Sequence, residues 1–458
     1  MGRNLKNVFI VSVGFLCLFT AYASLQGLQS SLNSEEGLGV ASLSVIYGAL
    51  ILSSVLLPPI IIKNLGSKWT IVASMGCYVT YFLGNLYPGW ATLIPTSVIL
   101  GLGGAPLWSA KCTYLTISAN QEAEENGKRA RDLVNLYFGI FFLLFQSSAV
   151  WGNLMSALIF GQDPGIAEIT EEDLWFCGAT DSCEYPGSAV GNTTRPAQNL
   201  VNTLLGCYVG FGVLAMVLVA VLLDNIDGDV ARTYRENREP LGSAVQGTFR
   251  HLKDKRQLLL IPLTIYSGLE QAFLSGDYNK YYVTCTMGIY FVGYSMICFG
   301  ATNALCSLAF GKMAQYTGRF ALFTFAAGMN CACIIALLCW KPHPDQLPVF
   351  FVFPAIWAMA DAVWQTQINA LYGVIFPDQR PAAFSNYRMW ESTGFLIAFA
   401  YSNFLCVNVK LYILIGALLV SFGLYGWVEY EEQKNSTVWA QNINANFEED
   451  MEDRELTA

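Results

Sequence analysis

The feature of this sequence that most constrains its fold is a series of long runs without any charged residue. A transmembrane helix needs roughly 20 mostly apolar residues to cross the hydrocarbon core of a bilayer. Six charge-free runs of that length hold one span each, and they cover residues 7–34, 37–62, 133–162, 196–223, 281–311 and 320–340. Because lipid offers backbone groups no hydrogen-bond partners, we expect every run to be helical.

The remaining spans are interrupted. Residues 69–110 are charge-free and long enough for two spans, which a turn signal at Tyr87-Pro88-Gly89 divides. Four further spans contain or adjoin a charged residue, and they cover residues 257–278, 346–376, 388–405 and 411–428. The sequence therefore predicts an all-α membrane protein with 12 transmembrane helices.

The distribution of lysine and arginine supports this count and sets the orientation. With both termini in the cytoplasm, 19 of the 25 cations fall in cytoplasmic segments and 4 outside, while Lys111 and Arg388 lie within spans. Cytoplasmic loops are enriched in these residues, and an incorrect count would scramble the segregation. We therefore expect a multi-pass protein embedded in the lipid bilayer.

Composition excludes several classes of protein. Only 13% of the residues are charged, whereas soluble proteins carry about 25%. The net charge of −9 disfavours nucleic-acid binding, and two histidines leave little scope for a metal site. Since the chain has no catalytic triad and no phosphate-binding glycine motif, we expect neither enzyme activity nor a cofactor.

Weak internal similarity at an offset of about 250 residues suggests two six-helix halves. Residues 20–26 (TAYASLQ) match 264–270 (TIYSGLE), and residues 63–68 match the loop at 315–319. Parallel repeats of six helices are the layout of the major facilitator superfamily. We expect an N-terminal half (1–223), a cytoplasmic linker (224–256), a C-terminal half (257–428) and an acidic disordered tail (429–458).

The loop between spans 8 and 9 resembles a short motif of that superfamily. Gly311, Gly318 and Arg319 occupy the glycine and arginine positions, but Gln315 replaces the usual acid. The glycines permit a tight turn, and the arginine can bridge to a neighbouring helix. The missing acid argues against an ordinary gating charge relay.

Charged and amide side chains within the spans are functional candidates, because they are costly in lipid. Glu270 and Asp361 are either proton-exchanging groups or partners in hydrogen bonds between helices. With them, the candidate central cavity comprises Gln26, Gln29, Glu270, Asp361 and Gln365. Arg388 and Glu391, three residues apart, form a candidate ion pair. Lys111 is expected to extend to the membrane interface.

The exterior loop at 161–199 contains two features that are typical of an extracellular segment. Cys177 and Cys183 are expected to form a disulfide there, since a non-cytosolic compartment oxidises thiols. Asn192-Thr193-Thr194 is a glycosylation sequon, whereas the sequon at Asn435 falls in the cytoplasmic tail and should stay bare.

Several stretches resemble the Unc-93 family, and look closest to its vertebrate homolog A branch. They are residues 19–29 (FTAYASLQGLQ), 103–110 (GGAPLWSA), 134–142 (VNLYFGIFF), 361–367 (DAVWQTQ) and 387–391 (YRMWE). The resemblance runs from the first span to the twelfth and implies a major-facilitator-like fold. The founding member of the family is a regulatory subunit of a two-pore potassium channel, and a vertebrate relative escorts Toll-like receptors to endosomes.

Two functions follow from these observations. The resemblance implies an accessory protein of the plasma membrane, with a potassium channel or a receptor as partner; an endomembrane location stays open. The two-fold repeat and the acids in the spans favour the alternative, a secondary and proton-coupled carrier of a small solute. The sequence identifies neither the solute nor the partner.

The topology predicts that Asn192 is glycosylated and that Asn435 is not. Asn192→Gln should abolish the mobility shift that endoglycosidase treatment causes on gels, because only that sequon reaches the lumenal enzyme. Asn435→Gln is the matched control and should leave the shift intact. The reverse pattern would contradict the orientation.

Overall fold

The computed structural model describes residues 2–127, 130–162, 174–179, 195–225, 246–247, 249–376 and 380–456. Within them every regular element is helical. The helices are α1 (Arg3–Leu32), η1 (Glu35–Gly37), α2 (Leu38–Gly84), α3 (Trp90–Asn126), α4 (Ala130–Phe160), α7 (Gln198–Leu222), α10 (Lys255–Ala272), η2 (Phe273–Thr284), α11 (Cys285–Met287), α12 (Ile289–Thr317), α13 (Arg319–Cys339), η3 (Pro344–Gln346), α14 (Val349–Ile375), α15 (Arg380–Ser402) and α16 (Val407–Leu456).

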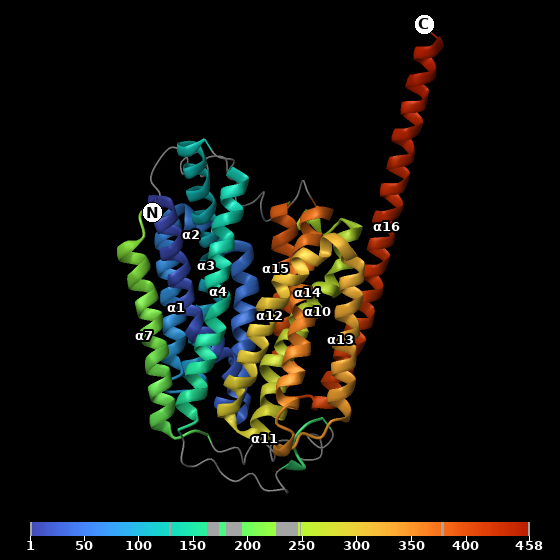
Figure 1. Cartoon of the computed structure of the whole chain (residues 1–458). Helices are drawn as coiled ribbons and strands as arrows, with labels where there is room; N and C mark the ends of the chain where they lie inside the picture. The colour runs from blue at the N-terminus through green and yellow to red at the C-terminus, as the bar shows by residue number, and fades with distance from the viewer. Residues whose placement is uncertain are drawn as a thin grey trace.

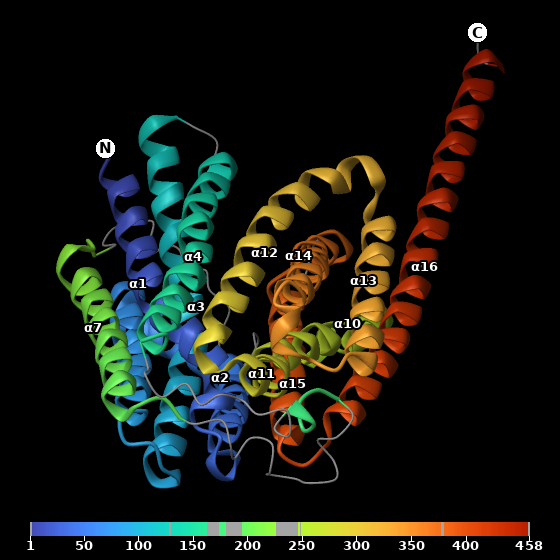
Figure 2. The ribbon, with the colours of Figure 1, turned by 60° about the horizontal axis from the view of Figure 1, so that its bottom comes forward.

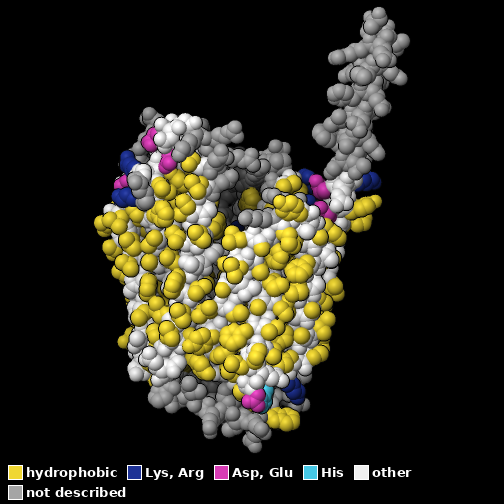
Figure 3. Space-filling model, viewed as in Figure 1, with side chains coloured by type: hydrophobic (Ala, Val, Ile, Leu, Met, Phe, Trp, Pro, Cys, Tyr) yellow, Lys and Arg dark blue, Asp and Glu magenta, His cyan; other side chains and the backbone are white. Residues whose placement is uncertain are grey.

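Ten of the described helical stretches are long and apolar enough to cross a membrane. Residues 67–84 of α2 and helix α15 lie at the positions of the two remaining predicted spans, so each of the twelve predicted positions is helical in the described chain. Figure 1 shows α1, α2, α3, α4 and α7 on one side and α10 to α16 on the other. The surface between the two ends of the molecule is covered with apolar side chains (Figure 3), as a lipid-facing surface requires.

A glycine with positive φ interrupts the helices at the same place in both halves. Gly66 interrupts α2 with φ 75° and ψ 166°, and Gly318 separates α12 from α13 with φ 79° and ψ 157°. Both values of φ lie in the region that favours glycine. These glycines stand at matching positions of the two loops in which sequence similarity is found, so the backbone repeats where the sequence does.

The exterior faces of the two halves are in contact. Ser31 Oγ lies 2.8 Å from Thr284 Oγ1, Asn279 Nδ2 donates to the Gly27 carbonyl oxygen at 3.2 Å, and Asn403 Nδ2 donates to that of Gly37 at 3.0 Å. Figure 2 shows α4 and α12 converging toward this end. The halves are therefore joined by hydrogen bonds on the exterior side of the molecule.

The structure corrects the predicted disulfide. Cys177 is bonded to Cys285 at the start of α11, not to Cys183, which lies outside the described residues. The neighbouring Gly178 amide donates to the Tyr281 carbonyl oxygen at 3.0 Å, so the loop of one half is seated on the other. Proximity in sequence misled the prediction, because tertiary folding decides which cysteines meet.

The last helix extends beyond the final predicted span. The sequence predicts a disordered tail from residue 429, and α16 runs as a helix from Val407 to Leu456 (Figure 1). Glutamate, glutamine and alanine, which favour helix, recur in this stretch.

We expect peptide mapping under non-reducing conditions to recover Cys177 linked to Cys285. Cys285→Ser should lower the free energy of unfolding by about 2–4 kcal/mol, because the bond closes a long loop in the unfolded chain. Cys339→Ser removes an exposed free cysteine and is the matched control. A peptide linking Cys177 to Cys183 would refute the assignment.

Candidate functional site

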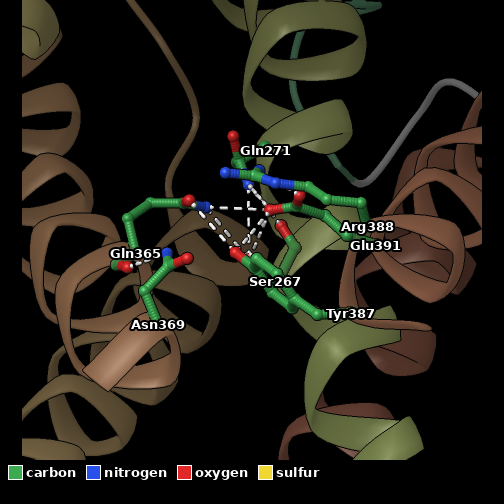
Figure 4. Close-up of polar contacts among 7 residues, drawn as sticks. All are labelled: Ser267, Gln271, Gln365, Asn369, Tyr387, Arg388 and Glu391. Carbon is green, nitrogen blue, oxygen red and sulfur yellow. Dashed lines mark hydrogen bonds and ion pairs between the residues drawn. The ribbon is translucent and has the colours of Figure 1, made fainter. Parts of the chain in front are cut away.

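Glu391 on α15 is the centre of a polar cluster in the C-terminal half (Figure 4). Its carboxylate is buried, and Oε2 accepts a hydrogen bond from Arg388 Nη1 at 2.7 Å. Its other oxygen, Oε1, has four donors within 3.5 Å: Tyr387, Gln365, Ser267 and Gln271. A buried carboxylate with this many donors is compensated for the loss of water.

Three helices supply the cluster from residues four apart in sequence. Ser267 and Gln271 lie on one face of α10, and Gln365 and Asn369 on one face of α14. Tyr387 and Glu391 have the same spacing on α15. Residues at this spacing share a helix face, so each helix contributes a short polar stripe to an otherwise apolar interface.

Two glycines allow α10 and α15 to approach closely enough for these contacts. A Cβ atom on Gly268 would lie 2.1 Å from the Glu391 carbonyl oxygen, and one on Gly394 would lie 2.2 Å from that of Ile265. Backbone therefore packs against backbone, as small residues permit in membrane helices.

Glu270 on α10 and Asp361 on α14 are both buried acids of the C-terminal half. Trp357 Nε1 donates to Glu270, and Asn303 Nδ2 donates to Asp361. Each acid therefore has one donor from a neighbouring helix, and the second oxygen of each carboxyl group accepts no hydrogen bond within the described chain.

The other candidate cavity residues lie in the N-terminal half. Gln26 Nε2 donates to the Tyr47 hydroxyl at 3.1 Å, and the Tyr47 ring stacks on Phe395 of the other half at 4.3 Å. Gln29 bonds Asn85 at 2.6 Å and Asn33 at 2.8 Å. Thus Gln365 joins the Glu391 cluster, Glu270 and Asp361 each accept from a different donor, and Gln29 belongs to a separate network.

Sequence reasoning did not find the ion pair between Asp277 and Lys410. The atoms Lys410 Nζ and Asp277 Oδ1 are 2.6 Å apart, both side chains are buried, and Ser402 bonds each of them. Both residues lie near the exterior ends of their spans, where a charged side chain is expected to reach water. The sequence does place an acid and a lysine at the same membrane depth, and this pattern could have predicted the ion pair.

At the cytoplasmic end, Arg319 of the loop motif bridges to another helix. Its Nε and Nη2 each donate to the Glu429 carboxylate at 3.1 Å, which is the two-point geometry typical of arginine. Gly311 lies within α12, and Gly318 forms the turn that directs Arg319 toward α16.

Known proteins with similar sequences define the family. The profile described as "Ion channel regulatory protein UNC-93" matches residues 31–424. This protein belongs to the UNC-93 family. It is 62% identical to "Protein unc-93 homolog A" of Danio rerio, over 95% of this chain and 94% of the relative. It is 35% identical to the "Putative potassium channel regulatory protein unc-93" of Caenorhabditis elegans, over 94% of this chain and 61% of the relative.

Solved structures show the fold that this UNC-93 family member shares. The nucleoside transporter NupG superposes with a TM-score of 0.65 at 12% identity, over 93% of this chain and 99% of NupG. A variant of the fucose:proton symporter FucP of E. coli gives a TM-score of 0.55 at 13% identity, with the same coverage. The fold is therefore that of the major facilitator superfamily, and its halves are the two helix groups of Figure 1.

The glycine contacts give a test of this site. Gly394→Ala should lower the free energy of unfolding by about 1–3 kcal/mol, because the added methyl group forces α10 away from α15. Gly416→Ala is the matched control, since no atom lies within 4 Å of its added carbon. Thermal unfolding in detergent measures both; equal melting temperatures would refute the close approach.

Proposed function

We propose that this protein is an accessory subunit that regulates a potassium channel in the plasma membrane. The observation that carries the proposal is the extent of similarity: 35% identity to the nematode potassium channel regulatory protein over 94% of this chain. The solute transporters of the same fold share only 12% and 13% identity with it. Their likeness supports the architecture and not their activity.

The geometry agrees with a regulatory role. Two buried acids of the C-terminal half are held by basic partners within that half, Glu391 by Arg388 and Asp277 by Lys410. The exterior contacts and the Cys177–Cys285 bond attach one half to the other. The two halves are therefore held together, and their lipid-facing helices present a surface that a second membrane protein can contact.

The alternative, a proton-coupled carrier of a small solute, is favoured by one feature. Glu270 and Asp361 are buried acids within the spans, and each has one carboxyl oxygen without a hydrogen-bond partner in the described chain. A carrier that uses these acids to exchange a proton should lose pH-dependent uptake in Asp361→Asn. Uptake that is absent from the wild type, or unchanged in the variant, removes the support for this alternative.

Co-expression with two-pore potassium channels tests the regulatory proposal. We expect the current or the surface level of at least one channel to change by about fivefold or more, which corresponds to a coupling free energy of about 1 kcal/mol or above. The control is co-expression of NupG, which has the same fold, at equal surface density. Currents and surface levels that match this control for every channel would overturn the proposal.

A further inference from the structure

Three lysines are buried in the described chain, and their surroundings differ. Lys410 keeps 0% of its surface exposed, Lys111 keeps 2% and Lys280 keeps 7%. Lys410 Nζ donates to Asp277 and to Ser402, so its charge is compensated. Lys111, which the sequence predicts at the membrane interface, lies instead among four aromatic rings of α3 and α4, so that prediction is wrong. The remaining lysine, Lys280, is the one whose charge is least compensated.

Lys280 lies in η2 without a hydrogen bond or an ion pair to any described residue. Its ammonium nitrogen lies over the ring of Tyr281, whose centre is 5.1 Å away. A cation above one ring recovers only part of the free energy that burial of an ion costs. Lys280 therefore needs a partner that the described chain does not supply.

The same ring lies below a second ammonium group. Lys410 Nζ is 5.0 Å from the centre of the Tyr281 ring. Asp277 supplies the carboxylate of this group, and its Oδ1 already accepts from Lys410 Nζ at 2.6 Å and from the Ser402 hydroxyl at 2.7 Å. Two positive charges and one negative charge are thus gathered here, and one positive charge is in excess. An anion bound at Lys280 balances it.

The backbone that carries Asp277 and Lys280 is unusual. The segment η2 is a π-helix of 12 residues. In other proteins π-helical geometry occurs mostly as single turns, and frequently at functional sites. A stretch with this geometry that also holds a buried and uncompensated charge is therefore a candidate for binding an ion.

This group lies at the exterior end of the C-terminal half. The Gly178 amide of the exterior loop donates to the Tyr281 carbonyl oxygen at 3.0 Å, and Cys285, four residues further on, is bonded to Cys177. The Lys280 nitrogen keeps some surface accessible to solvent, although the whole residue is only 7% exposed. The exterior solution is therefore the source of the ion.

The donor at this position selects a small anion. Carboxylates and phosphates are typically bound by several donors, such as the fork of an arginine side chain. Lys280 offers a single ammonium group, which acts as a compact point charge. A monatomic anion is satisfied by such a group and needs little more room than a water molecule. Chloride is the abundant anion of this kind in the exterior solution.

We propose that Lys280 binds a chloride ion at the exterior end of the C-terminal half. The ion neutralises the excess positive charge that Lys280 and Lys410 bring to the Tyr281 ring, and it stabilises the folded state of η2. The residues that carry this proposal all belong to one half of the molecule. The site is independent of channel regulation, so the two proposals fail separately.

Thermal unfolding of the purified full-length protein in detergent tests the proposal. Sodium chloride is compared with sodium gluconate at equal ionic strength, because gluconate is too large for a monatomic site. We expect the melting temperature to rise with chloride concentration until the site is filled, by about 2 °C or more in total. This comparison uses the wild-type protein and does not depend on the folding of a variant. Equal melting temperatures in the two salts would overturn the proposal.

Substitution at the lysine locates the site. Lys280→Met removes the charge and keeps the apolar stem, so the difference between the two salts should disappear. In gluconate this variant should unfold at the temperature of the wild type or above it, because no uncompensated charge is left in the folded state. Lys341→Met is the matched control, since Lys341 is an exposed lysine that also lies over a ring, that of Trp175 at 5.4 Å. A full chloride effect in Lys280→Met, or its loss in Lys341→Met, would contradict the assignment.

Discussion

Compensation of charge inside the bilayer is the constraint on which the rest of this structure depends. An uncompensated ion there costs several kcal/mol, so each one requires a partner that tertiary folding must supply. Arg388 pairs with Glu391 and Lys410 pairs with Asp277, while Trp357 donates to Glu270 and Asn303 donates to Asp361. The Lys410–Asp277 pair joins α16 to η2, and the donors of Glu391 join α15 to α10 and α14. The glycines of α10 and α15 bring these two backbones close together.

The arrangement of helices was predictable from the sequence because the bilayer imposes a simple rule. Runs without charge became helices at the expected places, and the glycine loops at Gly66 and Gly318 repeat in structure as they do in sequence. Glu270 and Asp361 could also be recognised from the sequence as acids within spans. Each of these patterns is local or periodic in the sequence, so it can be recognised without knowledge of tertiary contacts.

What could not be predicted depends on contacts between distant residues. Glu270 and Asp361 were recognised as acids within spans, but only folding shows that Trp357 donates to one and Asn303 to the other. Lys111 was assigned to the interface because a long side chain usually reaches water, whereas the rings of α4 enclose it here. Cys177 was assigned a partner six residues away and bonds one 108 residues away. Tertiary contacts, and not residue type, decided each of these cases.

In the proposed function, a transporter fold serves as the partner of a potassium channel. The most direct test is to co-express the tagged protein with two-pore potassium channels, purify it in mild detergent and measure the mass of the eluted particles. We predict a particle that contains both proteins in a fixed ratio and persists through dilution. Separate elution of the two proteins for every channel, with solute uptake by proteoliposomes of the protein alone, would contradict the proposal.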